Sequence, residues 1–196
     1  GGGGLSKLVL ARRTRVPTDG SVDALGLLEG LAARDPEAYQ FAVVLRDGAA
    51  FVGSTPERLF SLRGRSVRSE AVAGTRPRGG DAAGDAALAA ELLGSPKERA
   101  EHAIVRDGVA AALAGLCDGV RCAHESARVL RHASVQHLYC ALEGELAPGR
   151  TGASLLQALH PTPAVCGHPA DRAASEIAVR ERFDRGLYAG PVGWVG

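Results

Sequence analysis

The stretch that organises this chain is P-K-E-R-A-E-H-A-I-V-R, residues 96–106. Ser95 precedes it as a natural N-cap, Pro96 suits the first helical turn, and Glu98 stands three residues after Ser95 as a capping-box partner. Apolar residues then recur at helical spacing, namely Ala100, Ile104, Val105, Val109, Ala112, Leu113 and Leu116. The pattern predicts a helix of about five turns.

Glu101 lies in the first turns of this predicted helix, beside Ile104 and Val105 and close to the face expected to be buried. A buried carboxylate without a partner is costly, so Glu101 needs one. An arginine is one candidate, and a hard cation such as Mg2+, which prefers carboxylate oxygens, is the other. The spacing alone leaves both open.

The bulk properties describe one domain with a real core and no electrostatic preference for polyanions. The chain has 196 residues, 45% of them hydrophobic, and a formal net charge of +1, which gives no case for nucleic acid or an anionic membrane. It contains no run of about eighteen apolar residues. The four cysteines show neither CxxC spacing nor a zinc-ligand rhythm with the histidines, which favours reduced structural thiols.

The N-terminal residues 5–14 have strand composition, with apolar residues on both faces. Such a strand is expected at the centre of a sheet, covered on each side, with Lys7 pointing into an interior or a cleft. Desolvation favours the neutral amine of a lysine, which can then act as a base. The alternative is that Lys7 reaches back to solvent from the strand end.

Residues 22–73 have the pattern of one helix followed by short antiparallel strands. Residues 22–34 predict an amphipathic helix. Strands are expected at 39–46, 49–53, 59–62 and 67–73, the first two forming a hairpin that turns at Asp47-Gly48.

Glu57 is the carboxylate that stands out in this region. Pro56 breaks the run before it, so Glu57 is predicted to sit at a strand junction, where side chains tend to face a cleft. A surface ion pair with Arg58 is the alternative. Residues 73–80, A-G-T-R-P-R-G-G, read as a loop that can present N–H groups and a hydroxyl to an anion, although an ordinary solvated loop fits equally well.

A short helix is expected at 85–93, and further strands follow the long helix. One strand within 127–139 ends in V-Q-H-L-Y, and residues 142–146 return as its partner. His137 alternates with its neighbours in this strand, so it is either a core histidine with satisfied hydrogen bonds or a donor to a ligand. Two more helices are predicted, one capped by Thr151 and running to Leu159, the other over 169–182.

Both ends of the chain look cut. Gly1 to Gly4 lead directly into the first predicted strand without an initiator Met, and residues 193–196 fall inside a predicted strand or hairpin. We therefore expect residues 1–196 to be one domain that is truncated at both ends.

Seven segments, in this order, resemble the chorismate-utilising enzymes, which include anthranilate, aminodeoxychorismate, salicylate and isochorismate synthases. They are KLVLAR at 7–12, GSTPERL at 53–59, SEAVAGTRPRG at 69–79, SPKERAEHAIVRD at 95–107, VQHLY at 135–139, LHPTPAVCG at 159–167 and FDRGLYAGPVGW at 183–194. The last three are most like those of plant and algal isochorismate synthases. The resemblance implies an α+β fold of two packed antiparallel sheets with outer helices and a cleft for chorismate.

The resemblance also implies the chemistry of isochorismate formation, in which water attacks C2 of the ring and the C4 hydroxyl leaves. Lys7 matches the base that activates the water, and Glu57 matches the general acid that protonates the leaving hydroxyl. An acid and a base in one site need environments that push their pKa values apart.

The same comparison implies one metal ligand and a binding loop. Glu101 matches a glutamate that holds Mg2+ against the ring carboxylate, which neutralises and orients the substrate. Gly74 and Thr75 match the loop that cradles this carboxylate, and His137 lines the pocket. No organic cofactor is implied, because no redox step occurs. The plant-like segments imply a plastid location and a product that feeds phylloquinone, menaquinone or salicylate.

The family's domain continues with an arginine-bearing strand and a second Mg2+ glutamate that are not found in this sequence. We therefore expect the 196 residues alone to bind metal poorly and to be inactive. Three alternatives stay open: a salicylate synthase, which also expels pyruvate; an anthranilate-synthase-like lyase; and an inactive chorismate-binding fragment.

Overall fold

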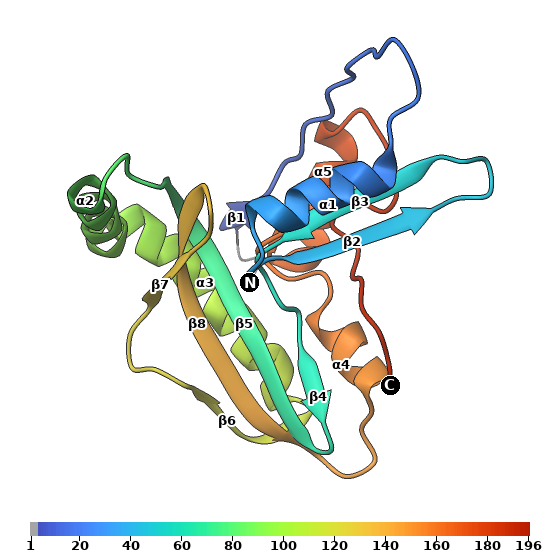
Figure 1. Ribbon diagram of the computed structural model, residues 1–196. Helices are drawn as coiled ribbons and strands as arrows, with labels where there is room; N and C mark the ends of the chain where they lie inside the picture. The colour runs from blue at the N-terminus through green and yellow to red at the C-terminus, as the bar shows by residue number, and fades with distance from the viewer. Residues whose placement is uncertain (1–3) are drawn as a thin grey trace.

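The computed structural model describes residues 4–196, which form an α+β fold with antiparallel sheets (Figure 1). The α+β class and the antiparallel pairing expected from the sequence are confirmed. Residues 1–3, most of the glycine run at the predicted N-terminal truncation, lie outside the described part.

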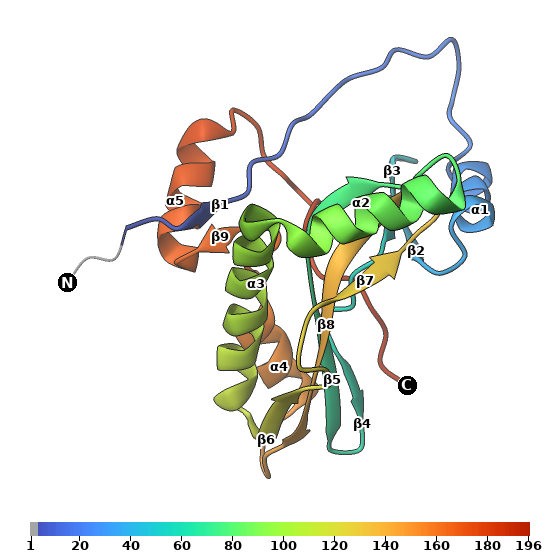
Figure 2. The ribbon, with the colours of Figure 1, turned by 90° about the vertical axis from the view of Figure 1, so that its left-hand side faces the viewer.

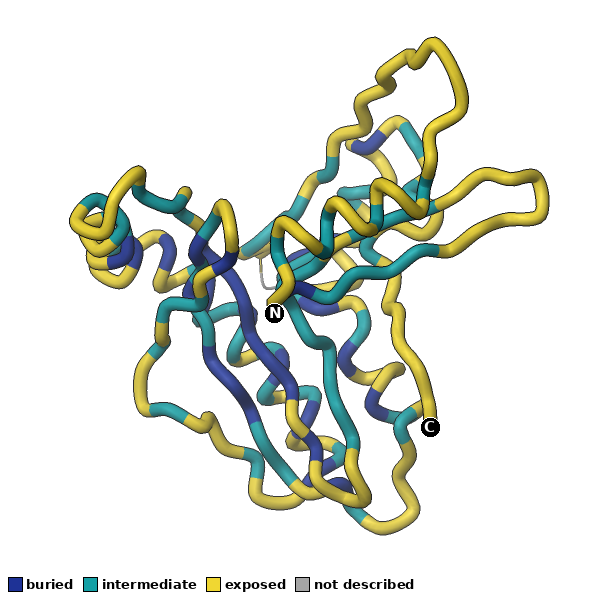
Figure 3. Tube along the Cα trace, in the orientation of Figure 1, coloured by how far each residue is buried: buried dark blue, intermediate teal, exposed yellow. Residues whose placement is uncertain are grey.

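The main sheet has five strands, in the order β4-β5-β8-β6, with β7 also paired to β8. Their bounds are β4 Ser61–Arg63, β5 Ser66–Pro77, β6 Cys117–Cys122, β7 Arg128–Arg131 and β8 Val135–Leu146. The two central strands, β5 and β8, have 12 residues each and hold the longest buried stretches of the sheet (Figure 3). The sheet is therefore built on one long antiparallel pair.

Both central strands are longer than the sequence predicts. The loop expected at 73–80 begins as strand, because β5 continues to Pro77 through a bulge at Gly74, whose φ of 78° few other residues adopt. The return strand expected at 142–146 is wrong, since β8 runs unbroken past Tyr139. Pairing with β5 on one edge and with β6 and β7 on the other keeps it extended.

One face of the sheet is covered by α3 (Pro96–Ala114), the helix predicted from residues 96–106 (Figure 2). Its inner side contributes Val105, Val109 and Leu113 to a core shared with β5, β8 and the short helix α4 (Gly152–Leu159). Ser95 Oγ accepts the Glu98 N–H at 3.3 Å, which confirms the N-cap.

The reciprocal half of the predicted capping box is absent. The Ser95 N–H already donates to the Glu91 carbonyl at 2.9 Å, because α2 (Ala82–Gly94) ends where α3 begins. The Glu98 side chain is instead drawn to Arg76, at 2.9 Å.

A second layer of structure lies beyond the sheet and is more open to solvent. It contains α1 (Ala24–Arg34) and the hairpin of β2 (Tyr39–Val44) and β3 (Ala50–Thr55), which turns at Asp47-Gly48 as predicted. No residue of α1 is buried, and the hairpin tip projects away from the core in Figure 3. β3 ends two residues before Glu57, and none of these elements contributes a buried residue to the core between the main sheet and α3.

The N-terminal strand differs most from expectation. β1 contains only Lys7–Leu8 and pairs with the equally short β9 (Gly167–His168). β9 leads directly into α5 (Ala170–Arg180). The central strand predicted over 5–14 is wrong, because Leu5 and Leu10 are 39% and 52% exposed. The predicted C-terminal strand or hairpin is also absent, since residues 191–196 have no regular secondary structure. Within residues 4–196, no helix combines the length and apolar character needed to cross a membrane.

Candidate functional site

Lys7 and Glu101, far apart in sequence, form an ion pair in the structure. Lys7 Nζ lies 3.1 Å from Glu101 Oε1, and the lysine side chain is only 9% exposed against 39% for the glutamate. Lys7 therefore points inward, and the alternative in which it reaches back to solvent is wrong. The partner of Glu101 is a lysine, not the arginine considered from the sequence.

The backbone around Lys7 is fixed by an ion pair at the end of α5. Arg185 binds Glu181 with Nε and Nη2, and its Nη2 also donates to the Val9 carbonyl at 2.8 Å. Glu181 Oε1 accepts the Ala11 N–H at 2.6 Å. We call Glu181 and Arg185 the α5 clamp, because together they bind the Val9 carbonyl and the Ala11 N–H.

Glu57 occupies the strand junction predicted for it and is electrostatically unusual. Its Oε1 is buried and has no hydrogen-bond partner among residues 4–196. Burial raises the pKa of Glu57 to about 7, with the nearby Lys7 lowering it and Glu70 raising it further. A carboxyl group with this pKa is half protonated at neutral pH, so it can donate a proton there.

The expected alternative, an ion pair between Glu57 and Arg58, is wrong. Arg58 Nη1 lies 3.6 Å from Glu70 Oε1, and the Arg58 N–H donates to Glu70 Oε2 at 3.3 Å. Tyr139 from β8 donates to the same Glu70 carboxylate at 3.2 Å. Glu70 therefore anchors the backbone directly after Glu57 and keeps a negative charge close to it.

The predicted binding residues Gly74, Thr75 and His137 lie together on β5 and β8. Thr75 and His137 are cross-strand neighbours, and Thr75 Oγ1 is 3.0 Å from His137 Nδ1. Burial lowers the pKa of His137, so the ring is neutral at pH 7. Thr75 itself is exposed, so its hydroxyl is within reach of a ligand. These residues stand on a strand bulge and not on the loop that was predicted.

The bulge at Gly74 is held from the helix side. A Cβ at Gly74 would lie 3.1 Å from Glu98 Oε2 and 3.2 Å from Glu98 Cβ, so a larger residue would have to push the Glu98 side chain of α3 away by a few tenths of an ångström. The Glu98 carboxylate is bound by Arg76 Nη1, which also donates to the Thr75 carbonyl. Arg76 thus joins α3 to the strand segment that carries Thr75.

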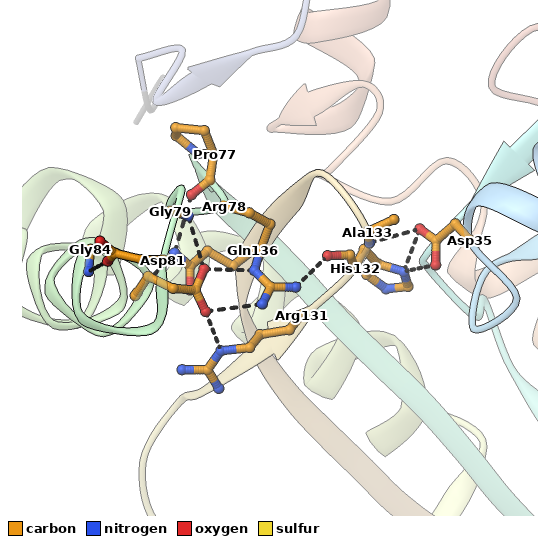
Figure 4. Close-up of polar contacts among 11 residues, drawn as sticks. Asp35, Pro77, Arg78, Gly79, Asp81, Gly84, Arg131, His132, Ala133 and Gln136 are labelled. Carbon is orange, nitrogen blue, oxygen red and sulfur yellow. Dashed lines mark hydrogen bonds and ion pairs between the residues drawn. The ribbon is translucent and has the colours of Figure 1, made fainter.

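A second polar network fixes the ends of β5 and β8 (Figure 4). Asp85 accepts from Arg78 at 2.6 and 3.0 Å, from the Gly79 N–H at 3.0 Å and from Arg131 at 3.3 Å. Arg78, which donates most strongly, holds the pKa of Asp85 well below its usual range. Arg78 also donates to the His132 carbonyl, and the His132 ring lies 3.0 Å from Asp35 at the end of α1. The network ties α1, α2 and the β7–β8 turn together beside the binding residues.

Residues 4–196 contain no ready-made metal cage, and two cavities of the structure lie away from the predicted residues. In the part of the chain that is described, no group of three or more His, Cys, Asp or Glu side chains could hold a metal ion. Two cavities, of about 260 and 530 Å³, are lined by other residues. The geometry therefore brings together a lysine, a half-exposed carboxylate and a carboxyl group of raised pKa, while Thr75 and His137 form a separate hydroxyl–imidazole pair.

Two residues of this arrangement, Glu70 and Glu98, did not emerge from the sequence as functional. The signal for Glu70 was present, because S-E-A-V-A places a charge inside a run of small and apolar residues, where a carboxylate requires partners. Glu98 was interpreted as a capping residue, and nothing local reveals its pairing with Arg76.

Comparison with known proteins identifies the family and the fold of this chain. The family described as "Chorismate binding enzyme" matches residues 2–196. Isochorismate synthase 2 of Arabidopsis thaliana, named chloroplastic, is 45% identical over 193 residues, which is 98% of this chain and 34% of that protein. The chloroplastic isochorismate synthase of Catharanthus roseus is 44% identical, over 98% of this chain and 33% of its own length.

A solved structure with the same fold is MenF, the menaquinone-specific isochorismate synthase from Escherichia coli. It matches with a TM-score of 0.77 and 30% identity over 84% of this chain and 38% of MenF. The chain spans about a third of the length of the plant relatives it matches.

Proposed function

The chain belongs to the chorismate-binding enzymes, and from that premise we propose that the whole protein is an isochorismate synthase, which converts chorismate into isochorismate. The observation that carries the proposal is the pairing of Lys7 with Glu101 beside a Glu57 that is half protonated at neutral pH. This arrangement offers an amine, a carboxylate and a carboxyl group that can donate a proton at neutral pH.

In the proposed reaction Lys7 takes a proton from the attacking water, and Glu57 gives a proton to the departing C4 hydroxyl. Hydroxide is a poor leaving group, so protonation as the C–O bond breaks lowers the barrier. The raised pKa of Glu57 suits this role, because an acid works best when its pKa lies near the working pH. Glu70 supports it by fixing the Arg58 N–H and by keeping negative charge near the acid.

Substrate binding is assigned to the Gly74 bulge, the Thr75 hydroxyl and His137. The bulge interrupts the ladder between Ala73 and Thr75, and a glycine leaves its backbone open to close approach by a carboxylate. The neutral His137 ring orients the Thr75 hydroxyl through their 3.0 Å contact.

Mg2+ is the metal we propose, with Glu101 as one ligand. The residue type fits, since Mg2+ is commonly bound through one or two carboxylates together with oxygens of the substrate. Its half-exposed side chain can be reached from solvent, and since no group of three or more candidate ligand side chains gathers among residues 4–196, oxygens of the substrate and water would complete the coordination. When bound, Mg2+ would neutralise and orient the substrate carboxylate.

We further propose that the protein acts in a plastid and that isochorismate feeds quinone or salicylate synthesis. The two plant relatives are named chloroplastic, and another relative is named for salicylate biosynthesis. The 196 residues by themselves are proposed to be an incomplete catalytic domain that is inactive alone; conversion of chorismate by the isolated chain would contradict this.

The test is to incubate the whole protein with chorismate and Mg2+ and to separate the products by liquid chromatography. We expect isochorismate without pyruvate. Release of pyruvate would instead indicate a salicylate synthase or an anthranilate-synthase-like lyase. Calorimetric binding of chorismate without turnover would indicate a binding protein that has lost the reaction.

A further inference from the structure

A cavity of about 260 Å³ lies between the first half of α3 and the connection from β6 to β7. None of the residues proposed for chorismate chemistry lines it. Its chemistry-bearing lining residues are His102, Arg106, Cys122, His124, Glu125 and Cys140. Two thiols therefore open into one small space together with basic side chains.

The strand register places these thiols on the same face of the sheet. Ala123 donates to the Ala141 carbonyl at 2.8 Å, and Cys122 lies opposite Leu142 in the β6–β8 ladder. Cys122 and Cys140 each stand one residue from the 123–141 pair, so their side chains emerge on the same side. All four cysteines of the chain are free; Cys122 is the exposed one, and Cys140 is buried.

The two thiols interact and differ in character. Burial raises the pKa of Cys140 to about 11, and a hydrogen bond with the Cys122 thiol adds to the effect. The Arg106 guanidinium interacts electrostatically with both sulfur atoms. Cys122 is the exposed sulfur, so it is the one that an external disulfide can reach. The thiolate is the form of a cysteine that attacks disulfides.

We propose that Cys122 and Cys140 form an oxidation site, in which Cys122 reacts with an oxidised low-molecular-weight thiol and Cys140 then closes an intramolecular disulfide. The Cys122 thiolate attacks the external disulfide RSSR, its S–S bond breaks, and one RS⁻ leaves. Cys140 sulfur then attacks Cys122 Sγ, and the second RS⁻ leaves. In sum, two protein thiols lose two electrons and two protons, and RSSR becomes two RSH.

Closure requires a small movement that the fold permits. Diagonal neighbours in an antiparallel ladder have Cα atoms about 7–8 Å apart, whereas a disulfide usually joins Cα atoms at most about 6.8 Å apart. β6 ends at Cys122, and the exposed residues Ala123 and Glu125 follow it, so the strand end can approach β8. A disulfide that holds the strand end away from its position in the reduced protein is strained. Strained disulfides are readily reduced, so the oxidation is expected to be reversible.

The experiment is an oxidation series of the whole protein with oxidised glutathione, followed by alkylation of free thiols, trypsin digestion and mass spectrometry. Trypsin places the four cysteines on four different peptides: 107–121 for Cys117, 122–128 for Cys122, 132–150 for Cys140 and 151–172 for Cys166. We expect the 122–128 and 132–150 peptides to become linked, while the buried Cys117 and Cys166 stay alkylated.

Two serine variants separate the roles of the two thiols. In Cys140→Ser, glutathione should remain attached to Cys122, because nothing displaces it. In Cys122→Ser, an exposed and conservative change, Cys140 should stay reduced. A lasting glutathione adduct on Cys122 in the unaltered protein, or earlier oxidation of Cys117 or Cys166, would overturn the proposal.

The rate of closure provides a second readout. Only the Cys140 thiolate attacks, so the rate should rise about tenfold per pH unit between pH 7 and 9, below the pKa of about 11. Arg106 keeps its charge throughout this range. A closure rate that does not change with pH would exclude Cys140 as the attacking thiol. None of these measurements depends on chorismate, so they stand apart from the proposed enzyme activity.

Discussion

Replacing Glu57 by glutamine should change the pH dependence of stability in a specific direction. Its pKa is raised to about 7 in the folded protein, against an ordinary value of 4.5. Between these values the native state binds more protons than the unfolded state, so stability falls as the pH rises. The favourable contribution of the neutral carboxyl is fully present below about pH 4.5 and is lost as the pH passes through 7.

The shift sets the size of the effect. A difference of about 2.5 pH units, at 1.36 kcal/mol for each, corresponds to roughly 3 kcal/mol between the two limits. Because Glu57 is not fully buried, relaxation and water entry reduce this figure, so it is an upper bound. Glutamine has nearly the shape of glutamate and cannot ionise. The free energy of unfolding of Glu57→Gln should therefore exceed that of the unaltered protein by up to about 3 kcal/mol at pH 8 and by almost nothing at pH 4.

The assay is urea denaturation of the two proteins at pH 4, 6 and 8, with Glu29→Gln as the matched control. Glu29 is an exposed glutamate on α1, so its replacement should change the free energy of unfolding by less than about 0.5 kcal/mol. In the whole enzyme, activity should decline above pH 7 as Glu57 ionises, and Glu57→Gln should remove about 100-fold or more of it. An equal stability difference at pH 4 and pH 8 would refute the reasoning, because the carboxyl would then not titrate near 7.

Three further predictions concern the residues around Lys7. Lys7→Gln should reduce isochorismate formation by about 100-fold or more while leaving the fold intact by circular dichroism, and surviving activity would rule out Lys7 as the base. Glu101→Gln should raise the Mg2+ concentration for half-maximal activity about tenfold or more, yet cost under about 1 kcal/mol in a melt, since its ion pair is half exposed. Glu181→Gln should speed hydrogen exchange at the Ala11 N–H, which Glu181 accepts. Arg185 lowers the pKa of Glu181 to about 2, so the stability contributed by the Glu181 carboxylate is present above pH 4.5 and should disappear as the pH falls to 2.

The local elements of the fold were predictable because their signals are local. Ser95 before Pro96 caps α3, Asp47-Gly48 turns the β2–β3 hairpin, and Thr151 caps α4. Each depends on the conformational preference of one or two residues, and this preference does not depend on the rest of the fold. The boundaries that failed depend on pairing across the sheet.

β8 shows the limit most clearly. Val135–Leu146 looked like two strands, because nothing in one strand reveals that three others pair along its full length. The loop over 73–80 failed for a related reason. Gly74 suggested a turn, but on a paired strand a glycine with positive φ makes a bulge and the ladder continues to Pro77.

The candidate site was found through motif resemblance, and its supporting residues were not. Lys7, Glu57 and Glu101 each fall in a segment that resembles a known family, whereas Glu70 and the α5 clamp act on backbone groups of residues distant in sequence. Hydrogen bonds to a backbone N–H or carbonyl leave no pattern in the sequence of the residue that is held. Such supports become visible only when the chain is folded.

Lys7 shows how the same outcome can arise from a different cause. From the sequence, Lys7 could point inward from a central strand over residues 5–14 or reach back to solvent from the strand end, and the strand proved to be two residues long. The lysine side chain is nevertheless only 9% exposed, since its Nζ lies against the Glu101 carboxylate and the α5 clamp fixes residues 9–11 just beyond it. With so short a ladder, the direction of Lys7 depends on these polar contacts more than on sheet pairing. Loosening the clamp should therefore affect Lys7 before it affects the core around α3.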